Sequence, residues 1–197
     1  MLSEPLQVTL KVVKAFEYLE IPYLIGGSLA SAVHGIIRAT MDSDLVADIQ
    51  PTHIAPLVAF LKDEFYIDAE MILDAIAHAS SFNLIHLETM FKVDVFILKR
   101  RPFDLNQMQR RISQTVGDEP GEQAYFSTAE DIILAKLDWF RIGGEISERQ
   151  WRDILGVLDV QGDRLDFEYL HKWAASLGIE DLLNRAIQAS KGGADMI

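Results

Sequence analysis

The stretch YLIGGSLASAVHGIIRATMDSDLVAD, residues 23–48, decides the fold of this chain. Its apolar start, Tyr23–Ile25, predicts a strand, and the small residues that follow the glycine pair predict a short helix. Two glycines allow a ligand to approach the backbone closely, and the free N–H groups of a helix's first turn attract an anion. Gly26, Gly27 and Ser28 are therefore predicted to bind a phosphate.

Two acids begin the next predicted strand of the same stretch. In an extended strand, residues two apart project to the same side, so the carboxylates of Asp42 and Asp44 are expected to lie together. At about 5 Å and an effective dielectric of about 20, they would repel by about 3 kcal/mol without a proton or a cation between them. Asp94 alternates with Val93 and Val95 in a second β-rich run and supplies a third carboxylate.

Such an acid cluster, defined as Asp42, Asp44 and Asp94, suits one or two Mg²⁺ ions, or Mn²⁺, held against a triphosphate. We therefore expect all three residues to be metal ligands and catalytic residues of a nucleotidyl transfer. One metal ion would bridge the triphosphate, and the second would activate the acceptor hydroxyl.

The combination resembles the nucleotidyltransferase superfamily that includes DNA polymerase β, and its nearest match is the small bacterial AbiE-type toxin branch with its uncharacterised relatives. The resemblance covers Gly26 to Asp94, about a third of the chain. It departs at Ser43, where these families usually carry an apolar residue or a third acid; Ser43 is expected to point away from the carboxylates. The resemblance implies an α+β fold, with a mixed sheet flanked by helices and an all-helical C-terminal part.

Four further residues gain a nucleotide-binding role from the same resemblance. Arg38 and Thr40 match an arginine and a Ser/Thr beside the acids, although Arg38 could equally brace Asp42. Lys136 lies on an apolar helix stripe, where an ammonium must reach water or find an anion, and a triphosphate would serve. Asp153 could orient Lys136 or contact the nucleotide; the alternative is a surface ion pair with Arg152.

Hydrophobic periodicity and capping residues predict most of the remaining helices and strands. The chain is expected to form two parts, a nucleotidyltransferase-like α/β core over 1–126 and a helical subdomain over 127–197 packed on it. Gly35 is expected to cap the helix that follows the glycine pair, and residues 127–130 to form a capping box. The chain is expected to fray from Lys191. The predicted helices span residues 6–19, 29–36, 52–61, 69–77, 127–142, 147–158, 166–177 and 180–189, and a hairpin joins strands 81–87 and 91–97.

Composition predicts a soluble, cytoplasmic protein with no membrane contact. The chain has no cysteine, and no uninterrupted apolar segment approaches about eighteen residues. A net charge of −12 argues against binding a long nucleic-acid duplex. Residues 92–111 nevertheless carry six basic and two acidic residues, which could meet a triphosphate or a short RNA end, or form a solvated loop that balances the acids.

The predicted reaction is Mg²⁺-dependent transfer of a nucleoside monophosphate from NTP to a hydroxyl of RNA, protein or a cationic small molecule. The toxin-type resemblance implies an antitoxin partner, whereas the acidic surface favours the acceptors of aminoglycoside and lincosamide nucleotidyltransferases. Two alternatives stay open, a non-catalytic binding or regulatory protein with the same fold and a metal-dependent phosphohydrolase. A second possible metal site would use three residues at helical spacing, Glu70, Asp74 and His78. A solvated helix face explains the same spacing as well.

Overall fold

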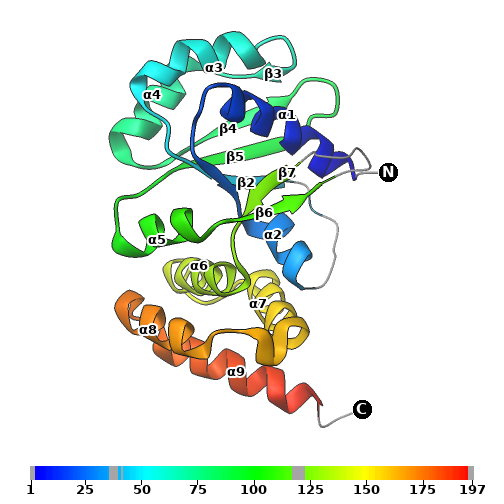
Figure 1. Ribbon diagram of the computed structural model, residues 1–197, viewed down its shortest axis with the longest axis vertical. Helices are drawn as coiled ribbons and strands as arrows, with labels where there is room; N and C mark the ends of the chain where they lie inside the picture. Colours follow the sequence, from blue (N-terminus) through cyan, green and yellow to red (C-terminus); the bar gives the residue numbers. More distant parts are fainter. Residues whose placement is uncertain (1–2, 36–39, 41, 117–122, 195–197) are drawn as a thin grey trace. The chain divides into compact units, whose positions relative to one another are not determined.

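The computed structural model describes residues 3–35, 40, 42–116 and 123–194, with side chains as far as Ser190. Contacts divide the chain into two compact units, residues 1–29 with 39–127 and residues 30–38 with 128–197. The first unit holds the β-sheet and the second is helical (Figure 1). None of the helices in the described residues is long and apolar enough to cross a membrane.

The first unit is built on a mixed seven-stranded sheet, in the order β3-β4-β5-β2-β1-β7-β6. Parallel pairing joins β1 to β7 and β2 to β5, and the other neighbours are antiparallel. The sheet confirms the predicted α+β class and the predicted hairpin of β4 and β5. Its strands are β1 (Tyr23–Ile25), β2 (Asp42–Ala47), β3 (Phe65–Tyr66), β4 (Ser81–His86), β5 (Lys92–Ile97), β6 (Ile112–Thr115) and β7 (Gln123–Phe126).

Helices cover the two faces of this sheet unequally. Helices α1 (Glu4–Tyr18) and α4 (Ala69–His78) contact the sheet, and α3 (Ile54–Leu61), preceded by the 3-10 turn η1 (Pro51–His53), packs on both. The residues of β2 and β5 that alternate with the acids are fully buried: Ser43, Leu45, Ala47, Val93 and Val95. On the opposite face, α5 (Pro102–Arg110) packs Leu105 and Met108 against Leu24, Val46 and Leu98. The acid end of that face is only partly buried.

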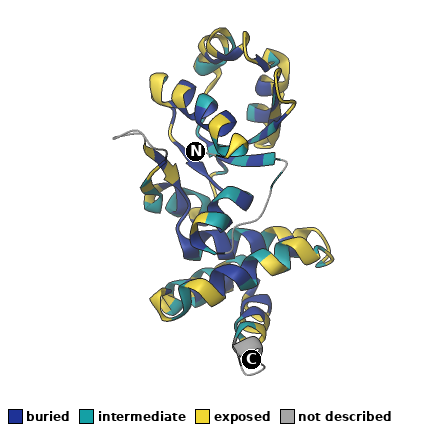
Figure 2. Cartoon of the chain, turned by 90° about the vertical axis from the view of Figure 1, so that its right-hand side faces the viewer, coloured by how far each residue is buried: buried dark blue, intermediate teal, exposed yellow. Residues whose placement is uncertain are grey.

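The second unit consists of helices that each have a buried and an exposed side (Figure 2). Thr128 is the N-cap of α6 and accepts the N–H of Asp131, so the cap lies one residue beyond the predicted Ser127. Asp131 is fully buried and also accepts a hydrogen bond from the Tyr169 hydroxyl. The helices are α6 (Ala129–Ile142), α7 (Glu148–Gln161), α8 (Phe167–Leu177) and α9 (Glu180–Ala194), with the 3-10 turn η2 (Gly162–Arg164) between α7 and α8.

Gly35 follows α2 (Gly27–His34), but the reason for glycine differs from the predicted cap. Its φ is not among the positive values, and a Cβ at this position would lie 3.0 Å from the backbone of Gly156 on α7. Two chain segments therefore approach closely where neither carries a side chain. At the other end of the chain, α9 continues to Ala194, five residues beyond the predicted helix end at residue 189.

Candidate active site

The register of β2 and β5 sets the geometry of the acid cluster. The strands run parallel, with Asp44 opposite Asp94 and Asp42 opposite Lys92. Paired residues, and residues two apart on one strand, project to the same face. All four side chains therefore belong to one face of the sheet, on neighbouring strands, and Ser43 belongs to the other face. The described residues contain no group of three His, Cys, Asp or Glu side chains already placed to hold a metal ion.

The glycine turn lies directly against Asp44. The Gly26 N–H donates to the Asp44 carbonyl oxygen at 2.9 Å, which continues the pairing of β1 with β2. Gly27 opens α2 with φ +53°, and a Cβ there would lie 1.7 Å from Oδ2 of Asp44. The space that a side chain would need is thus occupied by a carboxylate of the acid cluster. Ser28, the second residue of α2, is buried.

Thr40 contacts the first acid of β2. Its Oγ1 lies 3.0 Å from Oδ1 of Asp42 and 2.8 Å from the Asp42 carbonyl oxygen, so it can donate to either. This contact orients Asp42 from within the chain and gives Thr40 a position beside the acids. Arg38, the other residue predicted in this segment, lies outside the described residues.

Lys92 lies on the same face as the acids, a position that was not predicted for it. Its Nζ lies 2.7 Å from Oδ2 of Asp94. This hydrogen bond is the largest influence that raises the pKa of Lys92, and the nearby charges of Asp42 and Asp44 raise it further. Lys92 was assigned only to a basic run, although strand alternation puts it on the same side as Asp94. The alternation of side chains along this strand is the sequence signal that places Lys92 beside Asp94.

Three other residues of the predicted basic run have local partners. Arg100 pairs with Asp48, and Arg101 with Asp104, both at 2.7 Å. Arg111 donates to the Met108 carbonyl oxygen and lies over the Tyr125 ring. The pairs of Arg100 and Arg101 agree with the interpretation in which the run balances local acids.

Lys136 and Asp153 come together in the helical unit. Lys136 Nζ lies 2.9 Å from Oδ2 of Asp153, and their side chains are only 10% and 8% exposed. The anion that the buried lysine requires is therefore supplied by α7. Arg152 pairs with Glu148 at 3.5 Å on the exposed side of α7, so the alternative of an Arg152–Asp153 surface pair is wrong.

The three residues on α4 that could resemble a metal cluster include an exposed ion pair. His78 Nδ1 lies 3.1 Å from Asp74 Oδ1, with both side chains about 70% exposed. Glu70 belongs to the first turn of the same helix. A solvated helix face accounts for all three residues.

Solved structures provide the comparison with known proteins, because neither a family model nor a curated protein matches the chain. An antigenic nucleotidyltransferase-like protein from Paracoccidioides brasiliensis aligns with a TM-score of 0.53 at 16% identity, over 96% of this chain and 94% of that one. The antibiotic-resistance factor ANT(2'')-Ia in solution aligns with a TM-score of 0.53 at 14% identity, over 99% and 100%. A crystal structure of ANT(2'')-Ia in complex with adenylyl-2''-tobramycin aligns with a TM-score of 0.53 at 14% identity, over 87% of this chain and 96% of that one. The chain thus has a nucleotidyltransferase-like fold.

Proposed function

We propose that this chain is a Mg²⁺-dependent nucleotidyltransferase that moves a nucleoside monophosphate from NTP to an acceptor hydroxyl. The observation that carries the proposal is the register that sets Asp44 opposite Asp94, with Asp42 on the same face and a glycine turn closed on Asp44. Three carboxylates on one partly buried sheet face bring together more negative charge than the single ammonium of Lys92 offsets, and like charges repel. A site for cations and phosphates accounts for them.

The donor set fits Mg²⁺, which prefers carboxylate oxygens together with substrate phosphates. Asp42, Asp44 and Asp94 are the proposed ligands. Bound Mg²⁺, or Mn²⁺ in its place, would polarise the phosphoryl oxygens and favour ionisation of the acceptor hydroxyl. Thr40 would keep Asp42 oriented through the hydrogen bond already present.

The glycine turn is the proposed triphosphate site. Gly26 lies between β1 and α2, and its N–H already donates to the Asp44 carbonyl oxygen. Gly27 and Ser28 open α2, so their N–H groups belong to a helix N-terminus, where anions are stabilised. The acceptor oxygen would form a bond to the α-phosphorus while the bond from that phosphorus to the bridging oxygen of the β-phosphate breaks. Pyrophosphate would leave with that electron pair, and the hydroxyl proton would pass to solvent.

Three other nucleotide-binding roles stay predictions. Arg38 would offset phosphate charge from the segment that precedes Thr40. Lys136 and Asp153 already neutralise one another, so their burial is explained without a ligand. For Lys136 to bind a triphosphate, its ammonium would have to leave Asp153.

For the acceptor, a cationic small molecule is favoured by the net charge of −12. The fold is shared with a protein crystallised with adenylyl-2''-tobramycin, an adenylylated antibiotic, which agrees with that class. The AbiE-type assignment, with RNA or protein as acceptor and an antitoxin as partner, rests on the sequence motifs alone. In this proposal, either class of acceptor would react at the same acid cluster.

The experiment measures to which molecule the labelled α-phosphate is transferred. Each of the four α-labelled NTPs is incubated with Mg²⁺ or Mn²⁺ and with aminoglycosides, lincosamides, RNA or cell extract. Asp44→Asn should abolish transfer, whereas Asp48→Asn should retain it because Asp48 pairs with Arg100. Label released only as free NMP would indicate a phosphohydrolase. A melting temperature unchanged by Mg²⁺ and NTP would indicate a non-catalytic protein, since a ligand at 100 times its Kd stabilises by about 2.7 kcal/mol.

A further inference from the structure

The face of the sheet that carries the acid cluster continues across β4 to the edge strand β3. Asn83 on β4 is paired with Asp94, and Ile85 on the same strand is paired with Lys92. Tyr66 on β3 is in turn paired with Ile85. Because paired residues project to the same face, Tyr66, Ile85 and Asn83 form a strip beside the acid cluster, which we call the edge strip.

The edge strip is open to solvent, whereas the other face of the same two strands is closed. Tyr66 is 54% exposed, Asn83 is exposed and Ile85 is half-buried. A sheet face that only meets water carries polar residues in alternation with the buried ones. An aromatic and an aliphatic side chain in register on the open face therefore indicate a binding surface. The closed face is formed by three side chains that are at most 2% exposed, Phe65, Phe82 and Leu84.

The edge strip has the length of a small molecule with two or three linked rings. Tyr66 is two strands and two residues away from Asp94, which places their Cα atoms about 12 Å apart. Asn83 lies between them, with its Cα about 5 Å from that of Asp94. Its carboxamide can both donate and accept hydrogen bonds. An acceptor that lies on Tyr66 therefore reaches Asp94 with its far end.

The charge around the edge strip determines the kind of acceptor that it attracts. Residues 62–97, which include β3, β4 and β5, carry seven acidic and two basic residues, a net charge of −5. One of the two basic residues, Lys92, is bound to Asp94. A phosphate backbone would be repelled by this charge, whereas an amine would be attracted. Tyr66 adds an aromatic ring face, which attracts apolar groups and cations alike.

We propose that the edge strip is the acceptor-binding surface, and that it takes a cationic small molecule of linked rings with amine and hydroxyl groups. This inference rests on the proposed function and adds to it the residues that recognise the acceptor. Tyr66 and Ile85 would cover one ring, and Asn83 would hydrogen-bond the next ring and set its hydroxyl beside Asp94. The triphosphate site, at the end of β1, lies across β2 from the strip, so the two substrates would meet at the acid cluster from opposite sides.

The test measures binding to the full chain by isothermal titration calorimetry, with Mg²⁺ and an α,β-methylene NTP analogue present. The probes are the aminoglycoside tobramycin and a single-stranded oligoadenylate RNA, and the wild type should bind only tobramycin. Tyr66→Ala should weaken tobramycin binding at least about tenfold, because that factor corresponds to roughly 60 Å² of covered apolar surface. Tyr66→Phe, which keeps the ring, should recover most of the loss. Tyr66→Lys should bind tobramycin more weakly than Tyr66→Ala, because it adds a repelling charge.

Tyr18→Ala is the matched control, since Tyr18 is 74% exposed but belongs to α1, outside the edge strip. It should leave tobramycin binding unchanged. The affinity for the analogue, titrated alone with Mg²⁺, should be the same in all of these variants, and circular dichroism checks that each is folded. If Tyr66→Ala does not fold, Asn83→Ala serves in its place and should weaken tobramycin binding about fivefold, through the loss of a hydrogen bond.

Three outcomes would overturn the inference: a wild type that does not bind tobramycin, one that binds the RNA at least as tightly, or a Tyr66→Ala variant that binds tobramycin as well as the wild type does. The proposed function is judged separately, by Asp44-dependent transfer of label from NTP into cell extract. It stands if that transfer occurs, whatever the edge strip binds. Absence of both the transfer and the binding of the analogue would overturn the proposed function and the inference together.

Discussion

A Cβ placed on Gly27 would lie 1.7 Å from Oδ2 of Asp44, so the glycine turn and the acid cluster share one packed contact. Gly27→Ala should therefore shift the Asp44 carboxylate and also impose a left-handed backbone on alanine. We expect a loss of about 2 kcal/mol or more in the free energy of unfolding, together with a loss of transfer activity. Chemical denaturation and the labelled-NTP assay measure the two effects.

Gly26→Ala is the matched control for that substitution. Its nearest contacts would be the Asp44 carbonyl oxygen at 3.8 Å and a Leu24 methyl at 3.9 Å, which is ordinary packing. Stability should stay within about 0.5 kcal/mol of the wild type. Equal destabilisation by the two alanines would show that the Asp44 contact is not the reason for glycine at position 27.

The buried pair of Lys136 and Asp153 should be costly to break. Lys136→Ala leaves a carboxylate that is 8% exposed without its ammonium, and we expect a loss of about 3–5 kcal/mol in the free energy of unfolding. Replacing both partners with Met and Leu should recover most of that loss. Arg152→Ala, which removes an exposed pair with Glu148, should cost less than about 1 kcal/mol. If Lys136→Ala is as mild as Arg152→Ala, the pair does not hold α6 to α7.

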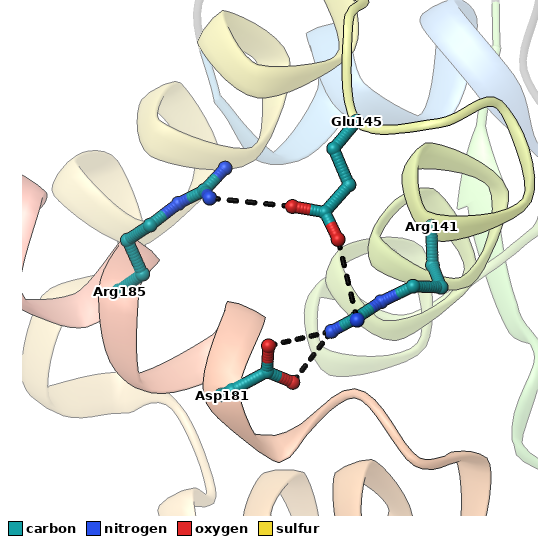
Figure 3. Close-up of polar contacts among 4 residues, drawn as sticks. All are labelled: Arg141, Glu145, Asp181 and Arg185. Carbon is teal, nitrogen blue, oxygen red and sulfur yellow. Dashed lines mark hydrogen bonds and ion pairs between the residues drawn. The ribbon is translucent and has the colours of Figure 1, made fainter.

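Arg141 and Asp181 should make stability depend on pH at the acid end. Arg141 donates to both carboxylate oxygens of Asp181 and also pairs with Glu145, which in turn pairs with Arg185 (Figure 3). The hydrogen bond from Arg141 lowers the pKa of Asp181 below its ordinary 3.8. The contribution is therefore fully present above pH 3.8 and is lost as the pH falls through the lowered value.

Thermal melts of wild type and Asp181→Asn between pH 2 and 7 check this. The wild type should melt higher at neutral pH, and the two curves should converge as the pH falls. High salt should shrink the difference, because the pair is exposed. A gap that widens toward low pH would contradict the assignment.

Tyr23 should make the stability of the fold depend on pH at the alkaline end of the range. Burial raises the pKa of its hydroxyl above the ordinary 10.0, and the hydrogen bond to Glu17, at 2.9 Å, raises it further. Because the unfolded chain ionises first, the stabilisation is present below pH 10.0 and is lost as the pH rises above it. Tyr23→Phe should cost about 1 kcal/mol at pH 8 and show a flatter profile up to pH 11 in urea denaturation. A wild-type profile no steeper than that of the variant would refute the role of Tyr23.

The two strands beside the glycine turn could be predicted because their signals are local. β1 spans Tyr23–Ile25 as predicted, and β2 begins at Asp42 as predicted, since an apolar run and an alternating run each indicate a strand directly. Lys92 was missed because its place beside the acids depends on pairing between β2 and β5, which no single segment encodes. The reason for Gly35 could not be predicted either, because its neighbour Gly156 is far away in the sequence although it is close in space. The two-residue β3 is too short to show any period.

The sign of its effect on stability separates a functional acid from a structural one. Asp44 shares its face with Asp42 and is paired in register with Asp94, and neighbouring strands lie about 4.8 Å apart. Without divalent ions, Asp44→Asn removes repulsion and should raise the melting temperature, by an amount equivalent to about 1 kcal/mol. Asp94→Asn removes the partner of Lys92 and should lower it. Adding Mg²⁺ with the α,β-methylene NTP analogue should stabilise the wild type and leave Asp44→Asn unchanged in a differential scanning measurement. If Asp44→Asn is destabilised without metal, the carboxylate serves the fold, and the proposed site loses its central residue.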